Sequence, residues 1–348
     1  MSRTDHPRRE AWLDSLKGFA ILLVILGHVL SGYLDAAAFP GAYTSFYTIR
    51  TWIYSFHMPL FFLISGFTFT LAYWRSGRLR WKGYFSQLFN LLWIYILFAV
   101  LQWGVKQVVP NLVNETYDLE DLKRMFIEPL GNFWYIYVLF VLYVLGALTR
   151  VADWPSQWIL FPGSLSIFVA DIHLDWTELT LYRIIYHFFF FALGSALCSR
   201  RRYLASDKCL GISAMVLAAA AYFYLFWYIR DWYANWKVAI AVATSFVFLA
   251  VFFRWKLLAK VSLLQLCGKY CLELYLLHTF FTAGLRSVLP LAGITRPWLS
   301  VWVNFIISTG VSLGLAWIAG KCRWMDLFFR PSRFLQWVRS KRPAAITK

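Results

Sequence analysis

Residues 12–32 read WLDSLKGFAILLVILGHVLSG, an apolar stretch with a lysine near its start and a histidine deep inside it. Its length and apolar character predict a membrane-spanning helix. At about 100° per residue, the eleven steps from Lys17 to His28 return to within roughly 20° of the same direction and rise about 16 Å. Asp14 falls within about 60° of both. Ionisable groups cost free energy inside a bilayer, so we expect this face to point into a protein interior or wet cavity and to mark function.

Composition indicates one integral membrane domain. Of the 348 residues, 60% are hydrophobic and only 15% charged, which no soluble domain of this length would need. We expect a short N-terminal segment (1–15), a transmembrane domain (16–320) and a basic tail (321–348). Apolar windows of about 17–25 residues predict an all-α fold with ten transmembrane helices, near 16–34, 51–74, 84–108, 132–149, 157–174, 181–198, 209–229, 235–253, 266–286 and 298–320.

The net charge of +17 would suggest nucleic acid as the partner of a soluble protein. Here most of the basic residues lie in alternate turns between the predicted spans, the pattern of loops retained in the cytoplasm. This predicts that both termini are cytoplasmic and that the partners include membrane lipids but no nucleic acid. The tail from Lys321, rich in Arg and Trp, is expected to anchor at anionic headgroups. The acidic 109–131 connection then lies outside, as a solvated loop or as a lid facing an acceptor.

Four histidines lie inside predicted spans at similar depth, about 18–21 Å from the cytoplasmic side: His28, His57, His187 and His278. An imidazole titrates near neutrality, so it can accept a proton from a hydroxyl nucleophile and return it to a leaving group. The alternative role is an interhelical hydrogen bond. That alternative is favoured for His187, which precedes four phenylalanines, and both roles stay open for His57. The placement of His28 on the face of Lys17 favours a functional role there.

Two further interpretations concern ligands. Lys17 and the four cations Arg75, Arg78, Arg80 and Lys82 predict a cationic rim on the cytoplasmic side, suited to a phosphate-bearing ligand. The alternative for these cations is helix orientation and headgroup binding. The histidines show no HxxxH or HxxE spacing and the five cysteines form no zinc-ligand pattern, so no metal is expected.

Three segments resemble the acyltransferase-3 family of integral membrane O-acyltransferases, which includes bacterial polysaccharide O-acetylases. The first is LDSLKGFAILLVILGHV, with a basic residue, ten intervening residues and a histidine. The second is FHMPLFFLISGF, Phe56 to Phe67, and the third is CGKYCLELYLLHTFF, Cys267 to Phe281. One departure is that the third predicted span begins without the arginines that many members carry there, which leaves only Lys82 upstream.

The resemblance implies a ten-helix domain that takes an acyl group from cytoplasmic acyl-CoA, usually acetyl-CoA, and places it on a sugar hydroxyl at the outer face. Within it, the first motif supplies the candidate catalytic residues His28, Lys17 and Asp14. Lys17 and Asp14 lie about 16–21 Å below His28 along the helix, too far for a triad, and suit an entrance. The second and third motifs supply candidate cavity or acceptor-binding residues: His57, Ser65, Glu273, Tyr275 and His278. The candidate acyl-CoA-binding residues are Arg75, Arg78, Arg80 and Lys82.

The sequence therefore predicts an O-acetyltransferase of the bacterial cytoplasmic membrane that modifies a cell-surface or exported glycan, or its lipid-linked precursor. Acetyl-CoA is the expected co-substrate, and no metal is required. Two alternatives stay open. One is a glycan or lipid-precursor transporter without acyl transfer, and the other is a transferase of succinyl or longer acyl groups.

Overall fold

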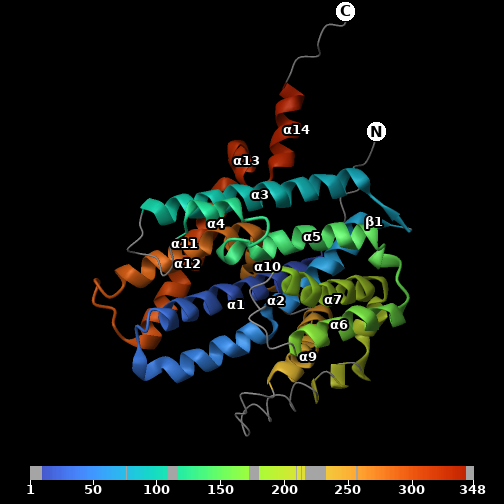
Figure 1. Cartoon of the computed structure of the whole chain (residues 1–348), viewed down its shortest axis with the longest axis horizontal. Coiled ribbons are helices and arrows are strands. Elements are labelled where there is room, and N and C mark those ends of the chain that lie inside the picture. The colour runs from blue at the N-terminus through green and yellow to red at the C-terminus, as the bar shows by residue number, and fades with distance from the viewer. Residues whose placement is uncertain are drawn as a thin grey trace, which may run out of the picture.

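The computed structural model describes residues 10–75, 77–108, 117–171, 180–208, 210–212, 214–215, 233–255 and 258–341. These residues are almost entirely helical, which confirms the all-α prediction; a hairpin of two short strands, β1 (Trp74–Arg75) and β2 (Arg78–Leu79), is the exception among them. The helices, most of which are labelled in Figure 1, are α1 (Ala11–Asp35), α2 (Tyr43–Tyr73), α3 (Trp81–Val108), α4 (Leu119–Lys123), α5 (Trp134–Leu148), α6 (Leu160–Asp171), α7 (Thr180–Ser199), α9 (Tyr233–Arg254), α10 (Ser262–Lys269), α11 (Cys271–Val288), α12 (Pro297–Ala319), α13 (Asp326–Phe329) and α14 (Pro331–Lys341).

Six helices in the described residues are long and apolar enough to cross a membrane. They are α1, α2 with the turn before it, α3, α5 with the turn before it, α7 and α12. Two shorter apolar helices, over 157–169 and 238–254, coincide with further predicted spans. The predicted span 209–229 falls mostly outside the described residues. A membrane protein is therefore supported, whereas the count of ten and the sides of the termini stay predictions.

The predicted span 266–286 is not one helix in the structure. It is divided at Tyr270, which caps the end of α10 with φ −107° and ψ 25° and precedes α11. The short helix α10 packs closely against α1. A Cβ placed on Gly268 would lie 1.7 Å from the backbone oxygen of Asp14, and one on Gly18 would lie 1.9 Å from that of Leu264. Both glycines are required because α1 and α10 meet backbone to backbone.

Helix α1 is the centre of the bundle, since α2, α9, α10, α11 and α12 all pack against it (Figure 1). The same kind of close approach joins α2 to α7. A Cβ on Gly66 would lie 1.9 Å from the oxygen of Phe191, and one on Gly194 would lie 1.9 Å from that of Leu63. Gly66 lies in the second motif, where the small residue permits this close approach. The bundle thus fixes the three motif-bearing helices, α1, α2 and α11, relative to one another.

Helix α3 lies along α5 on one side of α1, and the C-terminal helices α13 and α14 contact the other side of α3. Figure 1 shows α14 extending away from the bundle at a steep angle to α3. Its sequence, PSRFLQWVRSK, is strongly amphipathic, as expected for a helix that lies along a membrane surface. Phe329, just before it, is buried in the core beside Phe98 of α3.

Candidate active site

Three of the four histidines that the sequence places inside predicted spans converge in the structure. The ring centroids of His28 on α1 and His278 on α11 lie 5.2 Å apart. His57 on α2 joins them through Tyr54, whose ring lies 4.8 Å from that of His57 and 6.2 Å from that of His28. His57 is 3% exposed and His278 is fully buried, whereas His28 is partly exposed. We call His28, His57, His278 and Tyr54 the histidine cluster.

Backbone hydrogen bonds orient two of these rings. The Nδ1 of His57 lies 2.8 Å from the carbonyl oxygen of Ile53, and that of His278 lies 3.0 Å from the carbonyl oxygen of Leu274. A carbonyl oxygen only accepts, so each Nδ1 carries a proton and each neutral ring keeps its Nε2 as an acceptor. The Nε2 of His278 is buried and has no hydrogen-bond partner among the described residues. The cluster therefore holds a proton acceptor that is not used in the fold.

Polar groups surround the cluster on the side away from Lys17. Tyr54 hydroxyl and Ser31 hydroxyl are 2.9 Å apart, within hydrogen-bonding distance. The guanidinium of Arg50 lies 5.1 Å from the centroid of the Tyr54 ring, a cation–π geometry. Each of these residues is three or four positions from a cluster member on its own helix. The helical repeat therefore brings them to the same face.

His187 is not part of this cluster. Its ring centroid lies 4.4 Å from that of Phe62 and 5.4 Å from that of Trp134, and its Nδ1 lies 2.7 Å from the carbonyl oxygen of Arg183. These contacts agree with the packing role that the sequence favours for His187. Equal predicted depth does not place two histidines in the same site. His187 lies on α7, which packs against α2 and α5, whereas the cluster residues lie on α1, α2 and α11.

A cavity of about 1260 Å³ lies beside the cluster, between α1, α2, α3, α5, α11 and the C-terminal segment. It is larger than most ligand pockets, which measure about 300–1,000 Å³. Both Lys17 and Asp14 line it, as their entrance role predicts. Ser65, Glu273 and Tyr275 line it as well. The site residues predicted from all three motifs therefore meet at this cavity or at the adjacent histidine cluster.

The deep end of the cavity stops short of the cluster. Val24 lines it, but His28, one turn further along α1, does not. Tyr275 also lines it, and its ring centroid is 6.1 Å from that of His278. Tyr275 donates a hydrogen bond to the carbonyl of Asn132, which holds the ring in place. One layer of side chains thus separates the cavity from the histidine cluster.

Five basic side chains besides Lys17 line the cavity, namely Arg80, Lys82, Lys269, Arg330 and Arg333, and we call the part that they line its wide end. Of the four predicted acyl-CoA-binding residues, Arg80 and Lys82 line the cavity. Arg78 is exposed on β2 outside its lining, and the side chain of Arg75 lies outside the described part of the structure. Two cavity carboxylates have arginine partners: Glu10 pairs with Arg201 at 2.8 Å, and Glu273 with Arg330 at 2.6 Å.

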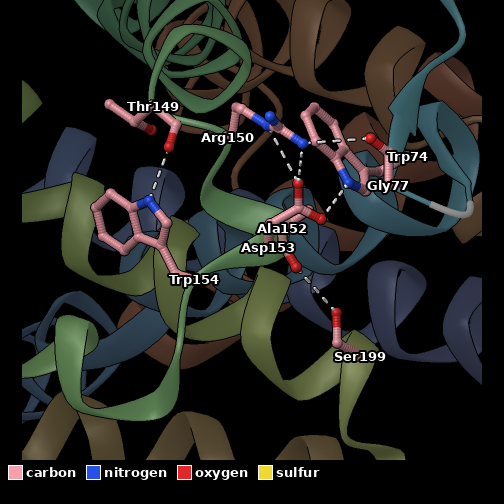
Figure 2. Close-up of polar contacts among 8 residues, drawn as sticks. All are labelled: Trp74, Gly77, Thr149, Arg150, Ala152, Asp153, Trp154 and Ser199. Carbon is pink, nitrogen blue, oxygen red and sulfur yellow. Dashed lines mark hydrogen bonds and ion pairs between the residues drawn. The ribbon is translucent and has the colours of Figure 1, made fainter.

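The hairpin that leads into α3 is anchored by the turn after α5 (Figure 2). Trp74 donates from its Nε1 to Asp153 Oδ1 at 2.8 Å, and Arg150 donates from Nη2 to Asp153 Oδ2 at 2.9 Å. The same Arg150 nitrogen lies 3.5 Å from the carbonyl oxygen of Gly77 at the tip of the hairpin. Arg150 itself has a positive φ of 52°, a conformation that costs free energy in a residue with a Cβ. Arg150 and Asp153 thus fix the hairpin that precedes Arg80.

Several site residues were not predicted. Tyr54 and Ser31 could have been found, because each lies three positions from a predicted histidine on the same helix. Tyr135, whose hydroxyl is 3.2 Å from that of Ser65, lies in a segment that gave no polar signal beyond its tyrosines. Arg330 and Arg333 also line the cavity, although the sequence predicted only headgroup binding for the tail. Within the described residues, no group of three or more His, Cys, Asp or Glu side chains is arranged to hold a metal ion.

Comparison with known proteins identifies the class. The family model of the acyltransferase domain, acyltransferase-3, matches residues 10–321, and the chain therefore belongs to this family. It is 31% identical over 175 residues to nodulation protein NolL of Mesorhizobium japonicum. The alignment covers 50% of this chain and 45% of NolL. It is 28% identical over 188 residues to nodulation protein NolL of Sinorhizobium fredii, covering 53% and 48%. The aligned part thus spans about half the length of these curated relatives. No solved structure matches the chain.

Proposed function

We propose that this protein is an O-acetyltransferase that moves an acetyl group from cytoplasmic acetyl-CoA to a hydroxyl of a cell-surface or exported glycan. Membership of the acyltransferase family supports acyl transfer. One observation carries the proposal: His28 and His278 form a pair one side-chain layer beyond a large cavity whose wide end is lined by cations. A bacterial cytoplasmic membrane is the proposed location, with the wide end of the cavity toward the cytoplasm.

The lining of the cavity suits both the charged and the apolar parts of acyl-CoA. Cations at the wide end suit the phosphates of CoA, because charge-assisted hydrogen bonds to phosphate are strong and well oriented. Apolar side chains also line the cavity, among them Phe61, Leu139 and Ile94, and suit the pantetheine arm. The thioester would then lie near Tyr275, with the histidine cluster ahead of it.

In this mechanism the Nε2 of His28 takes the proton of the acceptor hydroxyl while the hydroxyl oxygen attacks the thioester carbonyl. The carbon–sulfur bond breaks, and His28 returns the proton to the departing thiolate, so that the atoms and charges balance. His278 faces His28 with an unused acceptor nitrogen and orients the ring or shares its proton. Exclusion of water would protect the thioester from hydrolysis. Transfer through an acetyl-histidine on His28 is the second route, and labelled acetyl retained on the protein without acceptor would identify it.

The experiment compares surface polysaccharide from a strain that lacks the gene with strains complemented by the wild type or by His28→Ala. Mass spectrometry should show one acetyl substituent lost in the deletion strain, restored by the wild type and not by His28→Ala. A His28→Ala protein that inserts normally and restores acetylation would overturn the proposal and favour transport without acyl transfer. Supplying membranes with labelled acetyl-CoA and succinyl-CoA in parallel separates acetyl transfer from transfer of longer groups.

A further inference from the structure

The segment after residue 321 lies beyond the part of the chain that the family model matches. In the structure it is fixed against α3 at several points. Trp93 donates from Nε1 to the carbonyl of Leu327 at 2.9 Å, and the backbone nitrogen of Ser332 donates to Asn90 Oδ1 at 3.0 Å. Five residues of this segment line the cavity: Phe329, Arg330, Ser332, Arg333 and Gln336. The C-terminal segment is therefore a wall of the cavity as well as a surface helix.

An ion pair joins the C-terminal segment to α11 at the cavity. Arg330 pairs with Glu273 at 2.6 Å, and the Glu273 side chain is only 6% exposed. This pair comes from residues 57 positions apart in sequence. Since a carboxylate in this position needs a partner, the pair holds the start of α14 at the cavity wall.

The remaining charges of the wide end are unbalanced. Arg80, Lys82, Lys269 and Arg333 all line the cavity, and among the described residues none of them has a carboxylate partner. Arg80 makes a long contact of 3.5 Å with the carbonyl of Ala72, and Lys269 lies over the ring of Tyr270 at 4.9 Å. The other cavity arginine, Arg330, is already neutralised by Glu273. A ligand with several negative charges would supply the missing partners.

We propose that α14 completes the site for the phosphorylated nucleotide end of the acyl-CoA donor, with Arg333 binding phosphate across the cavity from Arg80 and Lys82. The inference rests on the proposed function, since it takes the donor to be an acyl-CoA. The nucleotide of CoA carries a diphosphate and a separate 3′-phosphate, and four cations around one opening suit that charge. The amphipathic sequence of α14 suits a membrane surface, a position that would bring the donor's nucleotide to the interface and its acyl group to the interior.

The test measures binding of CoA, dephospho-CoA and pantetheine to the purified full chain in nanodiscs of neutral phosphatidylcholine. Arg333→Gln should weaken CoA about tenfold, the loss of one charge-assisted hydrogen bond at a solvent-accessible site, and leave pantetheine unchanged. Arg339→Gln is the matched control, because Arg339 is an exposed arginine on the same helix that does not line the cavity. Arg333→Lys should restore most of the affinity.

Each outcome has a distinct meaning. If wild type binds CoA and Arg333→Gln binds it equally well, the inference is wrong and the proposed function stands. If wild type binds neither CoA nor dephospho-CoA, the proposed function fails together with the inference. A second measurement compares nanodiscs with and without phosphatidylglycerol. If Arg333→Gln lowers the retention of phosphatidylglycerol around the protein and leaves CoA affinity intact, Arg333 binds lipid headgroups and the proposal is overturned.

Discussion

The two halves of α1 have opposite surroundings. Its first half, with Asp14 and Lys17, borders an open cavity of about 1260 Å³. Its second half carries His28 into a close-packed group of rings from α2 and α11. Eleven residues, about 16 Å of helix, separate the lysine from the histidine. Under the proposed function, the two ends of one helix have different roles, with donor binding at one end and proton transfer at the other.

This division is testable because the two halves should respond to substitution differently. A change in the cluster should alter the rate of transfer and spare donor binding. A change at the wide end of the cavity should alter donor binding and spare the rate at saturating donor. Stability measurements then show which effects arise from folding.

The largest effect is expected for His28→Ala. Removing a general acid–base group typically costs 10²–10⁴ in rate, so acetyl transfer in membranes should fall by about a thousandfold. CoA affinity should stay within about twofold, because the cavity does not include His28. His187→Gln is the matched control, since His187 is an intramembrane histidine outside the cluster, and it should keep most of the activity. Equal losses in the two variants would contradict the division.

The next largest effect is expected for a substitution in the layer of side chains between the cavity and the histidine cluster. Val24 lines the deep end of the cavity and is 1% exposed. Val24→Phe should place a ring between thioester and His28 and lower kcat for acetyl transfer about tenfold to a hundredfold, with larger losses for longer acyl donors. The measurement compares kcat and donor affinity for acetyl-CoA with those for succinyl-CoA. Val24→Ile, with one methylene more than the native side chain, should show a smaller change in the same direction.

Sequence reasoning predicted the half of the site that follows helical periodicity. Lys17 and His28 share a face because of their spacing, and His278 contacts His28 because α11 packs against α1 and the two histidines lie at similar predicted depth. His187 shared that depth and still packs elsewhere, since depth along a helix does not say which neighbour the side chain faces. The Glu273–Arg330 pair could not be predicted at all. It depends on how the tail folds back on α3, a long-range contact without a local pattern.

The ion pair between Glu273 and Arg330 predicts an asymmetry in stability. Arg330→Gln leaves the Glu273 carboxylate buried without a partner and should cost about 2–3 kcal/mol. Glu273→Gln leaves Arg330, whose side chain is 30% exposed, and should cost about 1 kcal/mol, because the guanidinium can reach water. The double variant should be more stable than Arg330→Gln alone. Thermal unfolding in detergent measures all three, and equal losses from the two single variants would contradict the burial argument.

The smallest effect is expected for the hairpin in Figure 2. A substitution there tests the positioning of Arg80 and Lys82 without removing either side chain. Asp153→Asn removes the charge that joins Trp74 to Arg150, but the side chains of Arg150 and Asp153 are 65% and 35% exposed, so little stability should be lost. The hairpin precedes Arg80 and Lys82, and loosening it should raise the KM for acetyl-CoA about twofold to threefold at unchanged kcat, by analogy with other lost surface ion pairs. Glu120→Gln, which removes a more exposed pair with Lys123 on α4, is the control and should leave both constants unchanged. A fall in kcat for Asp153→Asn would mean that the wide end of the cavity acts on the chemistry directly.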